Sequence, residues 1–383
     1  MQRIAIKQLT ASNRPSAVRF LGAALFNWCG IWLSLLIADS APAQNFAPAF
    51  QIIETAISNG KIPGASVLIM RHGKVLQQRA LGVCEIEPKR PFQTDTICWI
   101  ASITKPITAA AAMKLVERGK LKLDTPIEAY LPQFATMATR DGKLHAVTVR
   151  QLMSHTSGIP ASVPLREPNF FTQRWFAHGL PEVVDAIATR PLEFAPGSHV
   201  NYSNAAPYIL GRIIEVCSGQ AFGDFVHSEI LQPLGMRDTG FSVAADQASR
   251  TAIVYRREKN ELSIYCRYDP TWRVHMTMPD GGLFSTPQDI AIFANSFLAK
   301  DSPILRAETV SMMLSPQSTG YGLGWILDKE NQFSHWGSSG TLVWADRSHG
   351  VVGVFFSQIQ DFNLLAELRN RFRNAVDAAI ESN

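Results

Sequence analysis

A serine and a lysine three residues apart, Ser102 and Lys105, form the first pair in the chain that could do covalent chemistry. On a helix, residues at this spacing are neighbours, with about 5 to 6 Å between their Cβ atoms. A serine hydroxyl alone is a weak nucleophile and needs a nearby base, which a lysine amine can provide. A capped helix start with a solvated lysine would show the same spacing, so the pair alone indicates little.

Two further segments carry polar groups suited to the same chemistry. Tyr202 and Asn204 stand just before an apolar helical stripe, so their backbone is predicted to form a loop. His335, Gly337 and Ser338 lie between two strand-like segments, where a glycine would let a substrate approach the backbone closely. Taken singly, the first segment also fits a helix cap and the second a plain hairpin.

The element that must position Ser102 is predicted from apolar spacing. Buried-type residues recur at helical intervals from about Ser102 to Arg118, and Gly119 ends the pattern. A proline is tolerated only in the first turn of a helix, where the N–H groups have no internal partner, so Pro106 fixes the start. Ser102 is therefore predicted to lie at a helix N-terminus, where the dipole favours developing negative charge.

The remaining pattern predicts a sheet built from both ends of the chain. Strand-like runs occupy residues 64–70, 75–83, 341–345 and 351–357, and helices are predicted at 50–58, at 286–298 and from about 363. Between them the chain indicates mostly helices and loops, with a T-x-x-Q cap at Thr148. We expect three parts: a leader or anchor at 1–43, an α/β domain from 44–119 and 285–383, and a mainly helical inserted domain at 120–284.

In this order and at these separations, the three segments resemble the S-x-x-K, Y-x-N and K-T-G set of class C β-lactamases and serine penicillin-recognising enzymes. The resemblance covers roughly Ile52 to Ile359 and includes framework stretches such as S-H-T-S-G-I-P at residues 154–160. It implies the β-lactamase and transpeptidase-like fold of the α/β (α+β) class. In that fold an antiparallel sheet is flanked by helices, a mainly helical domain is inserted, and the site lies between them.

The same resemblance implies a role for each site residue. Ser102 would be the nucleophile, Lys105 and Tyr202 the general base and acid, and Asn204 a hydrogen-bonding partner of the acyl group and of Lys105. The backbone N–H groups of Ser102 and Ser338 would form an oxyanion hole, an arrangement worth about 10²- to 10³-fold in rate per donor in other acyl-transfer enzymes.

One departure from the family pattern bears on the substrate. His335 and Trp336 stand where β-lactamases have K-T or K-S, so the fixed cation that meets a substrate carboxylate is missing or conditional. Hydrolysis of esters or small peptide amides is therefore the leading expectation. A D,D-carboxypeptidase or weak β-lactamase is the second, and a non-catalytic sensor of peptidoglycan fragments or β-lactams is the third.

Charge and the N-terminal residues suggest where the protein acts. Of the formal net charge of +4, residues 1–43 hold four basic residues against one acidic residue, which leaves +1 for the rest and argues against nucleic-acid binding. An uncharged run from Phe20 to Ile37 precedes an A-x-A-like signal ending at Ala43, so we expect export to the periplasm or medium. The run is also long enough for an uncleaved anchor facing outside the cytoplasm.

No cofactor and no metal are expected. The sequence contains neither an H-E-x-x-H motif nor the paired cysteines of a zinc site. Eight further histidines besides His335 belong to no such motif: His72, His145, His155, His178, His199, His227, His275 and His349. In an oxidising compartment four cysteines allow three disulfide pairings, but buried free thiols fit equally well; the four are Cys84, Cys98, Cys217 and Cys266.

Overall fold

The computed structural model describes residues 44–165, 178–258, 261–268 and 277–382. Residues Gln44–Asn383 form one compact unit. The expected leader and its cleavage signal at 1–43 lie outside the described residues. Within the described ranges no helix combines the length and apolar character needed to cross a bilayer.

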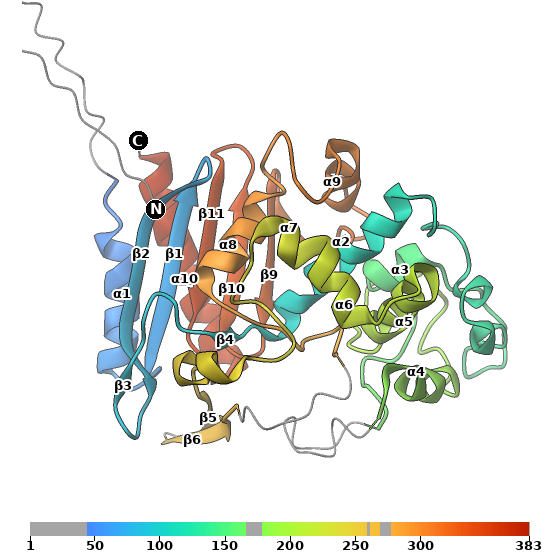
Figure 1. The fold of residues 1–383 in the computed structure, drawn as a ribbon, viewed down its shortest axis with the longest axis horizontal. Helices are drawn as coiled ribbons and strands as arrows, with labels where there is room; N and C mark the ends of the chain where they lie inside the picture. Colours follow the sequence, from blue (N-terminus) through green and yellow to red (C-terminus); the bar gives the residue numbers. More distant parts are fainter. Residues whose placement is uncertain (1–43, 166–177, 259–260, 269–276, 383) are drawn as a thin grey trace, which may run out of the picture. The chain divides into compact units, whose positions relative to one another are not determined.

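A seven-stranded antiparallel sheet is the centre of the fold, and it combines strands from both ends of the chain as predicted (Figure 1). Every neighbouring pair in it is antiparallel. In spatial order the strands are β3 (Arg90–Pro91), β2 (Lys74–Glu85), β1 (Gly64–Arg71), β11 (Val351–Phe356), β10 (Thr341–Asp346), β9 (Gln332–Gly337) and β8 (Ile326–Lys329).

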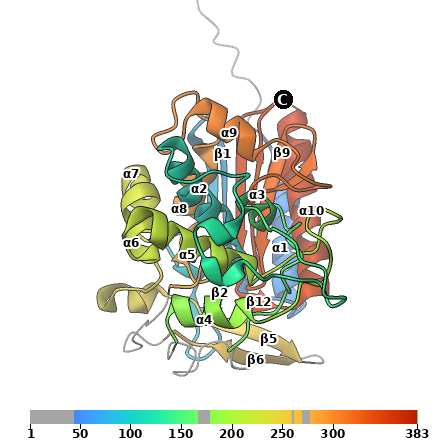
Figure 2. The same ribbon diagram turned by 90° about the vertical axis from the view of Figure 1, so that its right-hand side faces the viewer.

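Both faces of the central strands β1, β11 and β10 are buried, and the two-residue period of the strands divides them. In β10, Leu342 and Trp344 join one apolar cluster while Val343 and Ala345 join another. The first cluster is closed by α1 (Ala47–Ser58) and α10 (Phe362–Glu381), which pack together on one face. The opposite face is covered by α8 (Pro287–Asn295), and α2 (Thr104–Glu117) lies on that side (Figure 2).

Helices dominate the middle of the chain. Thr148 caps the first of them with the predicted reciprocal bonds to Gln151. The helical elements are α3 (Val149–Met153), α4 (Leu180–Ala188), α5 (Ala206–Ser218), α6 (Phe222–Val226), α7 (Gln232–Leu234), α9 (Ala307–Met313), one π turn (His227–Leu231) and 3-10 turns at Ile127–Ala129, Pro132–Phe134 and Ala245–Arg250.

Five short strands outside the seven-stranded sheet were not predicted. They are β4 (Cys98–Trp99), β5 (Val254–Glu258), β6 (Glu261–Cys266), β7 (Phe284–Ser285) and β12 (Ile359–Gln360). The β5–β6 hairpin was missed because β6 is largely exposed, so its sequence lacks the alternation of a half-buried strand. The division into an α/β domain and a helical insertion at residues 120–284 stays a prediction.

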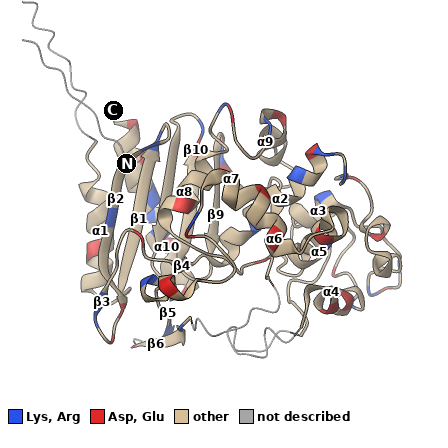
Figure 3. Ribbon diagram, in the orientation of Figure 1, with Lys and Arg blue, Asp and Glu red and all other residues tan. Residues whose placement is uncertain are grey.

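Charges and thiols complete the description of the fold. Basic and acidic residues are interspersed over the helices and strands, in keeping with the small net charge (Figure 3). The sequence left open whether the four cysteines form disulfides or stay as free thiols, and in the structure they are free thiols. Cys84, Cys98 and Cys266 are buried and Cys217 is half-buried. Burial raises the pKa of each thiol, so none is set up as a reactive thiolate.

Candidate active site

Ser102 lies at the N-terminal end of α2 as predicted, but two residues before the first residue of the helix itself. It occupies a 3-10 turn, Ala101–Ile103, and α2 itself begins at Thr104, with Pro106 as its third residue. The turn forms because Ala101 adopts a left-handed φ of 47°, which a non-glycine residue rarely does. Ser102 is the half-exposed residue of this turn, whereas the helix behind it is almost wholly buried. The Ser102 side chain is therefore accessible to a substrate, while the buried start of α2 fixes the Ser102 backbone.

Lys105 is buried, and its ammonium group is surrounded by three oxygen atoms. Nζ lies 3.0 Å from Ser102 Oγ, 2.9 Å from Asn204 Oδ1 and 2.8 Å from the carbonyl oxygen of Asp280. Nζ also lies 4.8 Å from the centre of the Tyr202 ring. The structure thus brings together all four polar residues of the first two predicted motifs.

The chemical types of these three acceptors determine what a neutral Lys105 would do. The amide oxygen of Asn204 and the backbone carbonyl of Asp280 can only accept, so each takes an N–H of the amine. A neutral amine has two hydrogens, and both are then used. Ser102 Oγ can both accept from and donate to a nitrogen, so the lone pair of a neutral amine can face it. The arrangement therefore aims a base at the serine proton.

Tyr202 stands beside the same serine. Its hydroxyl is hydrogen-bonded to Ser102, its ring is half-buried, and its centre lies 6.5 Å from that of His335. Burial raises the pKa of the Tyr202 hydroxyl, the bond to Ser102 opposes this, and the nearby Asp280 raises it further. Tyr202 is therefore a phenol at neutral pH and can pass a proton on rather than hold a charge.

Asn204 does not cap α5, which resolves the alternative left open by the sequence. The amide N–H of Ala206 instead donates to Ser203 Oγ at 3.1 Å, which leaves the Asn204 side chain for Lys105.

Gly337 and Ser338 lie at the end of β9, against the turn that carries the serine. A Cβ at position 337 would collide with the Ile100 carbonyl oxygen and crowd Ala101, so only glycine allows this approach. Thr341 Oγ1 donates to the same carbonyl at 3.1 Å. The exposed Ser338 follows directly, so its backbone lies close to the Ser102 turn and its side chain faces solvent.

His335 is fully buried and neutral. Its Nδ1–H donates to the Trp336 carbonyl at 2.9 Å, so Nε2 carries the lone pair, and among the described residues Nε2 has no partner. Burial and the charge of Lys105 lower the pKa of His335 to about 3, the bond to Trp336 opposes this, and Arg369 lowers it further. The position held by a lysine in β-lactamases thus carries no charge at neutral pH.

Trp336 points away from His335, as neighbouring strand residues do. Its ring packs on the α10 side, 5.2 Å from the ring of Phe362 and 5.1 Å from the guanidinium of Arg369. Arg369 is buried and donates to the carbonyls of Gly337 (3.4 Å) and Thr341 (3.2 Å), which ties the β9–β10 turn to α10.

Sequence reasoning missed two contributors to the site, Asp280 and Arg369. Asp280 contacts Lys105 through its backbone carbonyl. Every residue has such a carbonyl, so the residue type at position 280 does not indicate the contact. Arg369 lies on an amphipathic helix, where a charged residue is predicted to face solvent, but it is only 5% exposed. A buried arginine requires carbonyl partners, which only the fold reveals.

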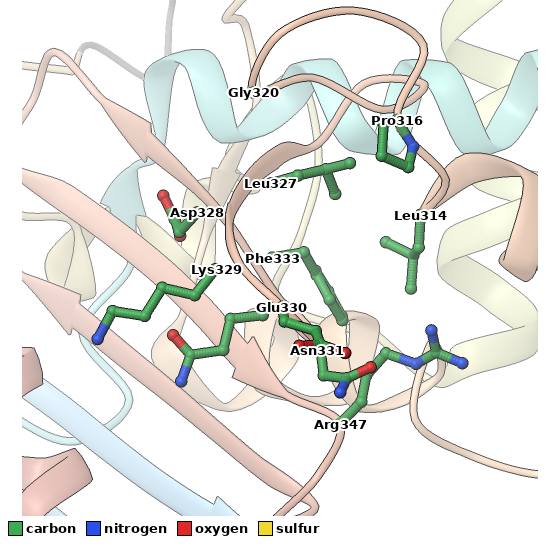
Figure 4. A pocket seen from close by; sticks show the side chains of 11 residues that line it. Leu314, Pro316, Gly320, Leu327, Asp328, Lys329, Glu330, Asn331, Phe333 and Arg347 are labelled. Carbon is green, nitrogen blue, oxygen red and sulfur yellow. The ribbon is translucent and has the colours of Figure 1, made fainter.

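A cavity of about 430 Å³ lies elsewhere, between the β8–β9 hairpin and the segment after α9 (Figure 4). It is lined in part by Leu314, Leu327, Phe333 and Arg347, and by none of the motif residues. We place the candidate site at Ser102 because a nucleophile and its base must be in contact. The described residues contain no cluster of His, Cys, Asp and Glu side chains suited to a metal ion.

Comparisons with known proteins identify the family of the chain. Residues 49–378 match the family model described as Beta-lactamase, so the chain belongs to the β-lactamase family and is a serine hydrolase of that family. An uncharacterised protein of Mycobacterium tuberculosis is 31% identical over 313 residues, 76% of this chain and 74% of that protein. Esterase EstB of Burkholderia gladioli is 36% identical over 211 residues, 53% of each chain.

The fold itself matches solved structures over most of its length. EstCE1, described as a hydrolase with promiscuous acyltransferase activity, superposes with a TM-score of 0.75 at 23% identity, over 86% of this chain and 97% of EstCE1. The predicted fold class, an antiparallel sheet flanked by helices, is thereby confirmed.

Proposed function

We propose that the chain is an exported serine hydrolase that acts on neutral esters or small peptide amides through an acyl-enzyme on Ser102. The observation that carries the chemistry is the environment of Lys105 Nζ, which lies 3.0 Å from Ser102 Oγ and donates to two groups that can only accept hydrogen bonds, Asn204 Oδ1 and the Asp280 carbonyl. The relatives described as an esterase and as a hydrolase with acyltransferase activity support acyl transfer from esters.

The proposed reaction uses the site residues in two half-reactions. Ser102 Oγ attacks the acyl carbon while its proton passes to Lys105, and the backbone N–H groups of Ser102 and Ser338 stabilise the oxyanion. The bond to the leaving group then breaks, and the leaving oxygen or nitrogen receives the proton through the Tyr202 hydroxyl. Water attacks the acyl-enzyme, gives a proton to the same pair, and releases the acid and the serine hydroxyl.

The neutral state of His335 supports uncharged substrates over β-lactams. A β-lactam carries a carboxylate beside its reacting ring, and a family enzyme with lysine at this position offers it a full charge. With its pKa lowered to about 3, His335 offers none at pH 7. Because Arg369 is buried against carbonyl groups and the Trp336 ring, it does not replace that cation.

A substrate profile tests this proposal against its rivals. Purified protein is assayed with short p-nitrophenyl esters, D-alanyl peptides and nitrocefin, and we expect the esters to have the highest kcat/KM. Preference for D-alanyl peptides or nitrocefin would instead support a D,D-carboxypeptidase or weak β-lactamase. A stoichiometric burst without turnover on every substrate would identify a sensor that has lost deacylation.

We predict that His335→Lys raises the acylation rate with nitrocefin by roughly 10- to 100-fold relative to a neutral p-nitrophenyl ester. A hydrogen bond to a charged group contributes about 1.5 to 3 kcal/mol net, which corresponds to that range. His335→Gln, which restores an acceptor without charge, is the control and should leave the ratio near that of the wild type. An equal change of both rates in the lysine variant would show that this position does not set charge preference.

Export is supported by the uncharged run and small residues of 1–43. We expect cleavage between Ala43 and Gln44, which intact-mass analysis of protein from the periplasm would show. A mass that retains the first 43 residues would support the anchor instead.

A further inference from the structure

The segment at residues 154–161, which takes no part in the proposed chemistry, holds the loop that carries Tyr202 and Asn204. The N–H of Asn201 donates to the His155 carbonyl at 2.9 Å, and the N–H of Asn204 donates to the Ala161 carbonyl at 3.0 Å. Both ends of the catalytic loop are thus bonded to one segment, and His155 is the second residue of that segment.

His155 makes two separate contacts with this loop. Its Nδ1 accepts the N–H of Ser203 at 3.1 Å, and its ring packs against the Tyr202 ring with centres 4.4 Å apart and planes tilted by 32°. A second phenol ring, that of Tyr321, packs against His155 in a T-shaped arrangement with ring centres 5.0 Å apart. His155 is only 3% exposed, so this arrangement has little room to relax.

The backbone conformation and the neutral charge state of His155 both favour its contacts with the catalytic loop. Its φ of 56° lies in the left-handed region, and in this conformation both its carbonyl and its Nδ1 meet the loop. Because Nδ1 accepts a hydrogen bond, it carries no proton. Burial, followed by the charge of Lys105 and the proximity of His335, lowers the pKa of His155 well below its ordinary value, so the ring stays neutral.

We infer that His155 is a positioning residue that aims the Tyr202 hydroxyl at Ser102. This inference rests on the proposed role of Tyr202 in proton transfer. The bond to Ser203 fixes the backbone next to Tyr202, and the stacked ring limits rotation of the phenol about its side-chain bonds. A misplacement of about 1 Å in a reacting group can cost about 10²-fold in rate, so a support of this kind acts on turnover more than on binding.

The test is His155→Asn. Asparagine tolerates the left-handed conformation and keeps an acceptor near the position of Nδ1, so the change chiefly removes the stacked ring. We expect kcat for a p-nitrophenyl ester to fall by roughly 10- to 100-fold while KM stays within about threefold. Thermal melting of the same preparation shows that the variant is folded.

A double-mutant cycle with Tyr202→Phe separates positioning from general loss of structure. The single change Tyr202→Phe removes the hydroxyl and should lower kcat by about 10²-fold. In that background there is no hydroxyl left to aim, so adding His155→Asn should change kcat by less than about threefold. If His155→Asn does not fold, Tyr321→Leu removes the brace from the other side and should show the same coupling with a smaller loss, about three- to tenfold.

The outcomes distinguish the two proposals. Equal losses from His155→Asn in both backgrounds, or no loss in the wild-type background, would overturn the positioning role while leaving Tyr202 as a catalyst. If Tyr202→Phe alone leaves kcat within about threefold, the proposed role of Tyr202 itself fails.

Discussion

Replacement of Ser102 by alanine is expected to abolish both turnover and covalent labelling by a fluorophosphonate probe, with kcat lowered by at least about 10⁴-fold. Ser102 Oγ lies 3.0 Å from Lys105 Nζ, whereas the amide oxygen of Asn204 and the carbonyl of Asp280, which also contact Nζ, are not nucleophiles. The protein should stay folded, because Ser102 is half-exposed and its loss removes a side-chain bond worth about 1 kcal/mol. The melting temperature should therefore change by only a few degrees.

Ser338→Ala provides the matched control for this change. The Ser338 side chain is exposed and the proposed mechanism uses only its backbone N–H, which alanine keeps. Its turnover and labelling should stay within a few-fold of wild type. Labelling of Ser102→Ala at the wild-type rate would remove Ser102 as the nucleophile, and loss of activity in Ser338→Ala would give that side chain a role.

The framework of the fold was predictable because its signals are local. The strands of the sheet alternate or run apolar, and Thr148 with Gln151 forms the reciprocal cap that the T-x-x-Q pattern indicates. Pro106 restricted the start of α2 to within one turn. The 3-10 turn before α2 was not predicted; it contains Ala101 in a left-handed conformation, close to Gly337 and Gly281, which are far away in the sequence.

The site was predictable only where chemistry resides in side chains. Ser102, Lys105, Tyr202 and Asn204 have types that indicate function, and the fold brings them together. The Asp280 carbonyl, 175 residues from Lys105 along the chain, is a backbone atom and gives no such signal.

The charge state of His335 could be predicted only in part. A histidine with an ordinary pKa of about 6.5 is already mostly neutral at pH 7, and burial beside Lys105 and Arg369 lowers the pKa to about 3 and removes the remaining charge.

Replacement of Lys105 by methionine is expected to slow acylation of Ser102 by about 10³-fold, within the range of about 10²- to 10⁴-fold for a lost general base. Methionine has a similar length but no basic nitrogen to take the serine proton. It also leaves Asn204 Oδ1 and the Asp280 carbonyl without their donor, at about 1 to 3 kcal/mol for each buried acceptor left unpaired. Removal of a buried charge offsets part of that cost, so the variant should fold with a lowered melting temperature.

Two companion variants determine whether the base or the charge of Lys105 matters. Lys114→Met makes the same change later in α2, where the amine donates to the Ile304 carbonyl, and should leave acylation unchanged. Lys105→Arg keeps a positive charge, but a guanidinium cannot be deprotonated in a protein. If the lone pair facing Ser102 is what activates it, a folded arginine variant must be as slow as the methionine variant. If arginine restores most of the rate, Lys105 acts through its charge, and the proton of Ser102 must leave through Tyr202.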